Sequence, residues 1–200
     1  MSPISREENQ ESSVNTSGYQ PGERKLLESA QNGDPKAYGL LVRQNQKKLF
    51  RFVYGILGNF DATEDIVQEA FIKGWESIKT FRPGYAFYPW ISTIARNLTY
   101  NWIHREERKE SLEKLQERGY DPESVDLGPF EKLLDKEGSK KLYKAIQALP
   151  IEFRTVFVMR QFEQMSYEDI ASFLKIPPGT VDSRLHRARK MLMEALKDIL

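Results

Sequence analysis

Apolar residues recur at helical spacing through most of this chain. From Glu23 to about Arg108 they fall three or four positions apart, the period with which an α-helix buries one face. The alternation of apolar and polar residues that marks a half-buried β-strand does not appear. The sequence therefore predicts an all-helical protein.

Composition and breaker residues divide the chain into four segments. Residues 1–22 are rich in Ser, Asn, Gln and Glu and predict a flexible tail, because they cannot bury enough apolar surface to offset the entropy of ordering. Residues 23–108 and 138–200 predict two small helical domains. The acidic segment between them, residues 109–137, contains several Gly and Pro residues and predicts a flexible linker.

Local signals predict where the helices begin and end. Gly55 and Gly58 are expected to break one helix, and Asp61 with Glu64 forms a capping-box-like start for the next. Pro89 is expected to be the first residue of a third helix. In the second domain the spacing predicts helices over about 139–148, 151–162, 167–174 and 180–197.

The net charge of +1 conceals two basic domains on either side of the acidic linker. Residues 24–109 hold 14 basic and 9 acidic residues, and residues 138–200 hold 11 and 7. Basic surfaces favour a polyanionic partner such as nucleic acid, because neutralised phosphates release their counterions.

The composition argues against several other classes of protein. With no cysteine and only two isolated histidines, the chain predicts no disulfide framework, no metal site and no cofactor. The first residues lack a basic-then-apolar signal pattern, and no apolar run approaches the ~18–20 residues of a membrane span. We therefore expect a cytoplasmic protein without a membrane span.

Residues 166–196 have the spacing of a helix-turn-helix. Ser166 can cap a short helix, Ile176 can pack beneath a Pro-Pro-Gly turn, and Thr180 can cap the next helix. The second helix has one apolar stripe and an opposite cationic face. The stripe consists of Val181, Leu185, Ala188 and Leu192.

The N-terminal half of such a second helix enters the DNA major groove. Together with Thr180 at the helix start, the residues expected at base edges are Asp182, Ser183, His186 and Arg187. Those expected to hold phosphates are Arg184, Arg189 and Lys190. The alternative is a solvated basic helix face, but the cap, turn and stripe together favour duplex DNA binding. The role of the Asp182 carboxylate stays open, since it repels phosphate unless it bonds a cytosine amino group or an arginine.

The predicted helix from Ala62 to Ser77 has an acidic face that includes an exposed isoleucine. The residues of this face are Asp65, Gln68, Glu69, Ile72 and Glu76. It can bind a protein partner or be a solvated face with one stray apolar residue, and the pattern alone does not choose.

Aromatic and basic residues crowd together between positions 81 and 105, a mixture that holds unpaired nucleic-acid strands by stacking. Trp90 and Trp102 share a helical apolar stripe and are assigned to the core. The rings of the preceding loop are the expected base contacts: Phe81, Tyr85, Phe87 and Tyr88. Arg96 and Tyr100 are expected to face outward from the helix.

Three ordered motifs resemble the extracytoplasmic-function (group 4) sigma factors of bacterial RNA polymerase, in the sigma-70 family. They are DATEDIVQEAFIKGWESIKTFR, FYPWISTIARNLTYNWIHR and SYEDIASFLKIPPGTVDSRLHRARK. The resemblance covers about residues 24–108 and 138–197, joined by a variable linker.

The resemblance implies a promoter-recognition subunit that performs no catalysis. The first domain would bind core RNA polymerase, through the acidic face, and the minus-ten element; the second would bind the minus-thirty-five element. Phe81 and Asn97 would hold a flipped minus-ten base, which can then be read on its pairing edge in the melted strand. The resemblance also implies an anti-sigma factor as partner. Ser92 and Asp182 depart from the commonest family pattern.

Two rival functions remain at this stage. A transcription regulator could end in a similar helix-turn-helix and bind an operator without polymerase. A recombinase-like enzyme would need a catalytic domain, and no strand-helix alternation or catalytic constellation is evident in the sequence.

Overall fold

The computed structural model describes residues 22–82, 85–110, 127 and 137–197. The elements are α1 (Glu23–Gln31), α2 (Pro35–Leu57), α3 (Phe60–Ser77), the 3-10 turn η1 (Ile78–Thr80), α4 (Phe87–Glu110), α5 (Glu137–Ala148), α6 (Ile151–Phe162), α7 (Tyr167–Leu174) and α8 (Pro178–Ala195). The described residues contain no strand, so the all-helical prediction is confirmed. The predicted tail and linker lie almost wholly outside the described residues.

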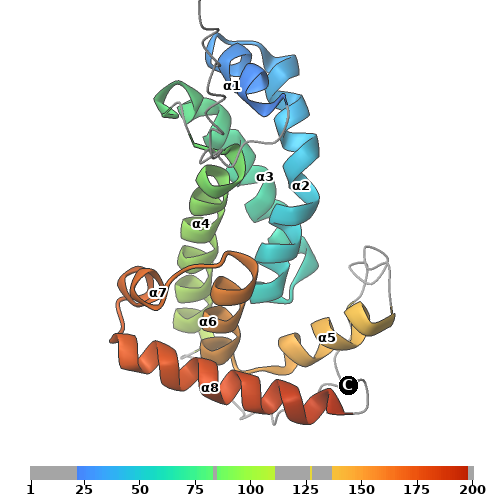
Figure 1. The fold of residues 1–200 in the computed structure, drawn as a ribbon, viewed down its shortest axis with the longest axis vertical. Helices are drawn as coiled ribbons and strands as arrows, with labels where there is room; N and C mark the ends of the chain where they lie inside the picture. The colour runs from blue at the N-terminus through green and yellow to red at the C-terminus, as the bar shows by residue number, and fades with distance from the viewer. Residues whose placement is uncertain (1–21, 83–84, 111–126, 128–136, 198–200) are drawn as a thin grey trace, which may run out of the picture.

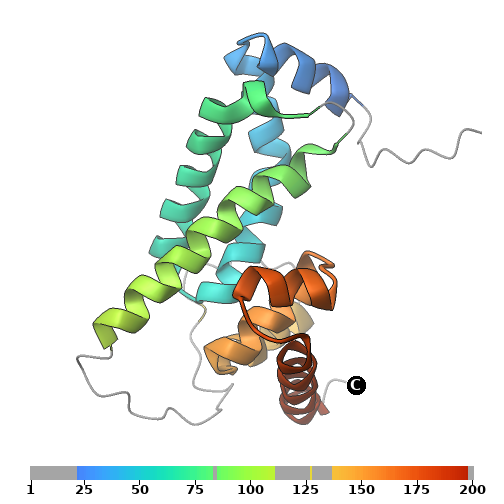
Figure 2. The ribbon, with the colours of Figure 1, turned by 90° about the vertical axis from the view of Figure 1, so that its left-hand side faces the viewer.

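The N-terminal unit consists of three long helices, α2, α3 and α4, with α1 lying across one end of them (Figures 1 and 2). The start of α2 is fixed by Asp34, whose side chain accepts hydrogen bonds from the backbone N–H groups of Lys36 and Ala37 at 2.8 and 3.3 Å. Pro35 follows as the first helical residue, where its missing N–H costs nothing. The sequence from Asp34 onward thus starts α2 by purely local chemistry.

Two predicted helix starts are wrong. Asn59, and not an Asp61–Glu64 box, caps α3, because the Asn59 side chain accepts the Ala62 N–H at 2.9 Å. Helix α4 begins at Phe87 and therefore before Pro89. The Phe87 N–H donates to the buried carboxylate of Glu23 at 2.6 Å, a cap that comes from 64 residues away and has no local signature.

The two glycines expected to break α2 behave differently. Gly58 ends the helix in the left-handed conformation, with φ of 66°. Gly55 lies within α2, so the prediction of a break there is wrong. It faces α6, where a Cβ at Gly55 would lie 3.4 Å from both methyl carbons of Val158, at the near edge of ordinary van der Waals contact.

The C-terminal unit, α5 to α8, packs mainly against one end of α2 (Figure 1), and side chains of α7 and of the turn before it also contact α4. It has a small core of its own, consisting of Val156, Met159, Ile170, Ala171, Val181 and Leu185. The largest apolar core belongs to both units, because residues of α5, α6 and α8 complete the core of the N-terminal helices. The two units therefore share buried surface.

Candidate nucleic-acid and protein-binding surfaces

Helices α7 and α8 form the predicted helix-turn-helix. The Ser166 hydroxyl accepts the Asp169 N–H at 3.0 Å, which confirms Ser166 as the cap of α7. Helix α7 ends at Lys175, which adopts the left-handed conformation with φ of 55°. The Ile176 N–H then bonds the Ala171 carbonyl at 3.0 Å, and Ile176 packs on the small C-terminal core.

The start of α8 lies two residues earlier than the predicted start at Thr180. Helix α8 begins at Pro178, so Thr180 already lies inside it and makes no side-chain cap. The predicted capping role of Thr180 is therefore wrong. Thr180 instead accepts, through its carbonyl, a hydrogen bond from the Ser183 hydroxyl at 3.0 Å.

The buried and the exposed face of α8 consist of the residues predicted for each. Val181, Leu185, Ala188 and Leu192 are buried. The opposite face is exposed and carries Asp182, Ser183, His186, Arg187, Arg189 and Lys190, with Arg184 half-buried beside it. No ion pair neutralises this face within the described part of α8, Asp182 included. The Arg187 guanidinium carbon lies 6.0 Å from the centre of the Phe153 ring, and the face as a whole stays exposed to a phosphate partner.

The aromatic segment before α4 is more buried than the sequence suggested. Phe81 is 3% exposed and packs edge-on against Trp90, with ring centroids 5.3 Å apart. Phe87 is fully buried between Tyr38 and Trp90. The prediction that Phe87 and Tyr88 are loop rings is wrong, because both lie in the first turn of α4. Neither phenylalanine offers a free face for stacking in this conformation.

A small pocket of about 320 Å³ opens between this segment and α4. Tyr85, 62% exposed, is its accessible aromatic ring. The other lining residues are Thr80, Phe81, Arg82, Ala86, Pro89 and Trp90. The pocket combines aromatic walls with the exposed Arg82 guanidinium, which suits a flat ring attached to a phosphate backbone.

The outward residues of α4 do not share one environment. Asn97 is exposed, as expected for a base-reading group. Tyr88, Arg96 and Tyr100 lie against the C-terminal unit. Burial lowers the pKa of Arg96, and burial followed by the Glu163 carboxylate raises the pKa of Tyr88. These three residues were predicted to face a nucleic acid and instead face the chain itself.

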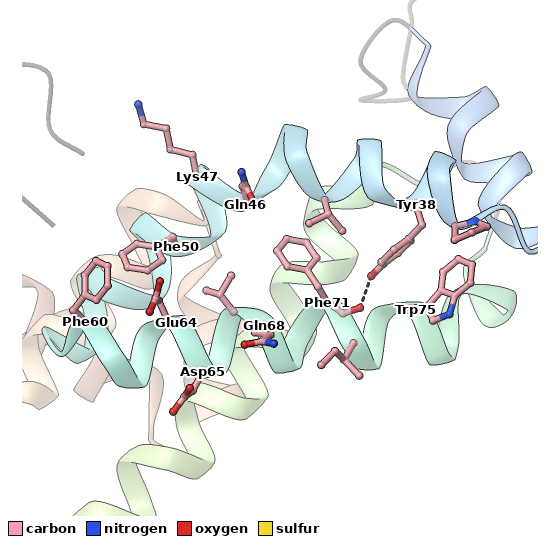
Figure 3. Close-up of a pocket in the computed structure, with 14 residues that line it drawn as sticks. Tyr38, Gln46, Lys47, Phe50, Phe60, Glu64, Asp65, Gln68, Phe71 and Trp75 are labelled. Atoms are coloured by element: carbon pink, nitrogen blue, oxygen red, sulfur yellow. Dashed lines mark hydrogen bonds between the residues drawn. The ribbon is translucent and has the colours of Figure 1, made fainter. Parts of the chain in front are cut away.

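Between α2 and α3 runs a larger groove of about 960 Å³ (Figure 3). Its apolar wall includes Val42, Phe50, Phe60, Val67 and Phe71. Tyr38 closes one end, where its hydroxyl donates to the Phe71 carbonyl at 2.6 Å, and burial raises the Tyr38 pKa. Gln46 and Lys47 rim the groove from α2, while Glu64, Asp65 and Gln68 rim it from α3 (Figure 3).

All residues of the predicted acidic face are exposed on α3: Asp65, Gln68, Glu69, Ile72 and Glu76. Asp65, Gln68 and Ile72 also line the groove, and Ile72 is 51% exposed. Glu69 pairs with Lys73 at 3.4 Å instead. Sequence reasoning missed the contribution of α2 to this surface. Phe50 of α2 meets Phe60 of α3 in the groove wall, with ring centroids 5.2 Å apart.

The described residues hold no group of three or more His, Asp or Glu side chains arranged to bind a metal ion. Among the same residues, none of the helices has the length and apolar character to cross a membrane.

Comparisons with known proteins match both units. Residues 41–109 match the family Sigma-70 region 2, and residues 139–192 match Sigma-70, region 4. The ECF RNA polymerase sigma-E factor of Haemophilus influenzae is 36% identical over 186 residues, which cover 88% of this chain and 95% of the relative. The RNA polymerase sigma-H factor of Pseudomonas aeruginosa is 34% identical over 187 residues, with 90% and 97% covered.

Solved structures match over similar lengths. The sigma factor RpoE of Bartonella quintana, in complex with the anti-sigma factor NepR, has a TM-score of 0.55 and 25% identity, covering 81% of this chain and 98% of its own. CnrH, in complex with the cytosolic domain of CnrY, has a TM-score of 0.53 and 23% identity, covering 88% and 97%, and supports the fold alone.

Proposed function

The chain belongs to the extracytoplasmic-function sigma factors of RNA polymerase, whose role is transcription initiation, and from this we propose which surfaces carry out that role. The observation that carries the proposal is that one chain presents both an exposed basic helix, α8, and an apolar groove beside an acidic face, on α3. The first suits duplex DNA and the second suits a helix of a protein partner.

We assign residues 138–200 to the minus-thirty-five element. Ser183, His186 and Arg187 are exposed near the start of α8, where a recognition helix meets base edges. Arg189 and Lys190, exposed one turn further along, are placed to hold phosphates.

Residues 23–108 are assigned to core polymerase and to the minus-ten element. Ile72 and the apolar wall of the groove would receive a polymerase helix, with Asp65 and Gln68 at its polar rim. Tyr85, with the small pocket, and Asn97 would receive unpaired minus-ten bases. The minus-ten residues supported by exposure are thus fewer than the sequence suggested.

The chain would act as an initiation factor in the cytoplasm and not as an enzyme, since binding surfaces account for its role. An anti-sigma factor is a further partner that we propose, because the similar RpoE was solved with one.

A binding and transcription assay with bacterial core RNA polymerase tests the proposal. The chain should join core polymerase and direct initiation from a bipartite promoter, found by mapping transcript starts after overexpression. Ile72→Glu places a charge at the apolar groove and should weaken core binding by about 2 kcal/mol or more. Its matched control is Leu40→Glu, because Leu40 is also exposed, at 45%, but lies outside the groove.

Tight operator binding by a chain that never joins core polymerase would instead establish a regulator. Equal loss of core binding in Ile72→Glu and Leu40→Glu would remove the groove from the proposal.

A further inference from the structure

Helix α1 lies beside η1 and the first turn of α4, the two elements between which the small pocket opens (Figure 2). We propose that α1 is a positioning element for the small pocket, with Glu23 and Gln31 as its two positioning residues. The inference rests on the proposed minus-ten role of the small pocket, and the experiment below tests the two separately.

The chain leaves η1 at a point that is held by Gln31, the last residue of α1. The side-chain amide nitrogen of Gln31 donates to the Phe81 carbonyl at 2.8 Å and to the Ile78 carbonyl at 3.3 Å. A glutamine amide has two N–H donors, so it can make both bonds at once. These two carbonyls belong to the first residue of η1 and to the residue that follows its end.

The chain enters α4 at a point that is held by Glu23, the first residue of α1. The Glu23 side chain is buried, and its carboxylate accepts the Phe87 N–H at 2.6 Å. The first N–H groups of a helix have no partner within the helix, so this bond fixes how α4 begins. Because Glu23 and Gln31 belong to one short helix, the two ends of the segment are fixed relative to each other.

Helix α1 is itself held in place by the core of the N-terminal unit. Leu27 and Ala30 are buried on its inner face. They belong to the same apolar core as Ile78, Phe81 and Phe87, the residues whose backbone groups α1 binds. The polar bonds and the apolar contacts of α1 therefore act on the same segment.

The small pocket lies between the two points that α1 holds. Its described lining residues all come from positions 80–90, so α1 acts on the pocket through the backbone of Phe81 and Phe87. The rings of these two residues pack against Trp90, with centroids 5.3 and 5.8 Å away. Tyr85 and Arg82, the exposed ring and cation of the pocket, lie between them in the sequence.

Holding both ends should matter more for base binding than for folding. Tyr85 is 62% exposed and makes little of the core, so its position depends on the backbone on either side of it. A binding site loses affinity when the groups that hold its contact residues are removed, because the contact residues must then be ordered by the ligand. Loss of either bond should therefore weaken the reading of a base.

The experiment uses the full chain bound to bacterial core RNA polymerase. Its ligand is a partly single-stranded DNA that carries the mapped minus-ten element, intact or with one base removed at each position in turn. At the position that the pocket reads, removal of the base should weaken wild-type binding about fivefold or more, as expected for one base stack. This ratio of the two affinities measures base reading and cancels contacts to the backbone.

Glu23→Met and Gln31→Met keep the length of each side chain and remove its hydrogen-bonding group. Each should lower the ratio at the position that the pocket reads to about twofold or less, with core binding unchanged. Glu23→Gln keeps an oxygen acceptor for the Phe87 N–H and should restore most of the ratio. Gln31 is only half-buried, so Gln31→Met tests the inference even if Glu23→Met does not fold.

Matched controls separate positioning from charge and from general stability. Glu28→Met removes the same charge as Glu23→Met from the exposed face of α1, where Glu28 pairs with Arg24. Gln44→Met makes the same replacement as Gln31→Met at an exposed position of α2. Both controls should keep the wild-type ratio.

Combining each variant with Tyr85→Ala shows whether α1 acts through the pocket. If it does, Glu23→Met should lower the ratio no further once Tyr85 is absent, because the two losses are then the same loss. Additive losses would overturn the inference. So would a wild-type ratio in both Glu23→Met and Gln31→Met, or an equal loss of affinity for intact and base-free DNA, which indicates a purely structural role.

Tyr85→Ala alone distinguishes this inference from the proposed function. If Tyr85→Ala lowers the ratio and the α1 variants do not, the small pocket keeps its minus-ten role and only the positioning role of α1 is overturned. If Tyr85→Ala leaves the ratio unchanged, the small pocket loses its minus-ten role, and the inference about α1 is overturned with it.

Discussion

Gly74 lies where α3 meets both of its long neighbours. A Cβ at this position would approach the Tyr38 hydroxyl to 2.5 Å and the Ile91 Cδ1 to 2.6 Å. The Tyr38 hydroxyl cannot move freely, because it donates to the Phe71 carbonyl within α3. The absence of a side chain therefore sets the spacing of α2, α3 and α4, and hence the width of the groove beside them.

Gly74→Ala should lower the free energy of unfolding by ~1–3 kcal/mol, because the added methyl overpacks the core. Gly39→Ala is its control within α2, since a Cβ there meets nothing within 4 Å. That variant should raise the free energy of unfolding by ~0.5–1 kcal/mol, because a helical alanine loses less backbone entropy. Urea denaturation measures both, and a change of the same sign in the two variants would contradict the packing argument.

Substitutions of Tyr85 and Phe87 should distinguish stacking on a DNA base from packing in the protein core. Tyr85→Ala should weaken binding to single-stranded minus-ten DNA by ~1–3 kcal/mol, the value of one base stack, and change stability by less than ~0.5 kcal/mol. Phe87→Ala should lower the free energy of unfolding by ~3–5 kcal/mol, because it empties a fully buried site. Fluorescence anisotropy and thermal denaturation of both variants measure the two effects; a DNA defect in a fully stable Phe87→Ala protein would restore Phe87 as a base contact.

The difference between these two rings also marks a limit of sequence reasoning. Composition identifies an aromatic-rich segment, but only tertiary contacts decide which rings are buried. Phe87 enters α4 because Glu23 caps its N–H from a distant helix, and no local pattern encodes that bond. Tyr85 lies just outside this cap and stays exposed.

Among the elements, α8 is the one whose surface could be predicted most completely. Its buried stripe and its exposed basic face follow from helical periodicity alone, and the structure confirms both. Its start is predicted at Thr180 but lies at Pro178, because a proline at the first helical position, where its missing N–H costs nothing, begins the helix earlier. Which face of a helix is buried can be predicted from periodicity even when the helix boundary is wrong, whereas the capping residue cannot.

Arg187→Ala on α8 should weaken binding to a duplex that carries the mapped minus-thirty-five element by ~1–3 kcal/mol, with little effect on a scrambled duplex, because a base-edge contact discriminates sequence. Lys190→Ala should weaken both duplexes alike and reduce the salt slope of binding by ~1, as expected for a phosphate contact. Lys197→Ala, two residues beyond the end of α8 and paired with Glu194, serves as the charge-matched control. Equal effects of Arg187→Ala on both duplexes would move Arg187 from base reading to phosphate binding.

On the scale of the whole molecule, the two units are joined by more than a linker. The sequence predicts two separate helical domains, since each has its own apolar stripes. It could not show that Ala145, Ile146 and Val158 complete the core of the N-terminal helices, because periodicity identifies a buried face but not the element that covers it. The shared core therefore couples the stability of the two units, and this coupling can be measured.

All three tryptophans lie between positions 75 and 102, so tryptophan fluorescence reports on the N-terminal unit, while far-UV circular dichroism reports on the helices of both. Because the core is shared, the two signals should give one coincident thermal transition. Ile170→Ala removes a fully buried side chain from the small C-terminal core, at a cost of ~2–5 kcal/mol, and should lower both midpoints together.

Met193→Ala, on the exposed side of α8, should leave both midpoints unchanged. If Ile170→Ala lowers the dichroism midpoint while the tryptophan midpoint stays in place, the units unfold independently. The shared core would then add little to the stability of the packed units, and polar contacts such as those of Glu163 and Gln147 would join them instead. Coincident shifts instead mean that parting the two units exposes apolar core, so any rearrangement that separates them must supply that free energy.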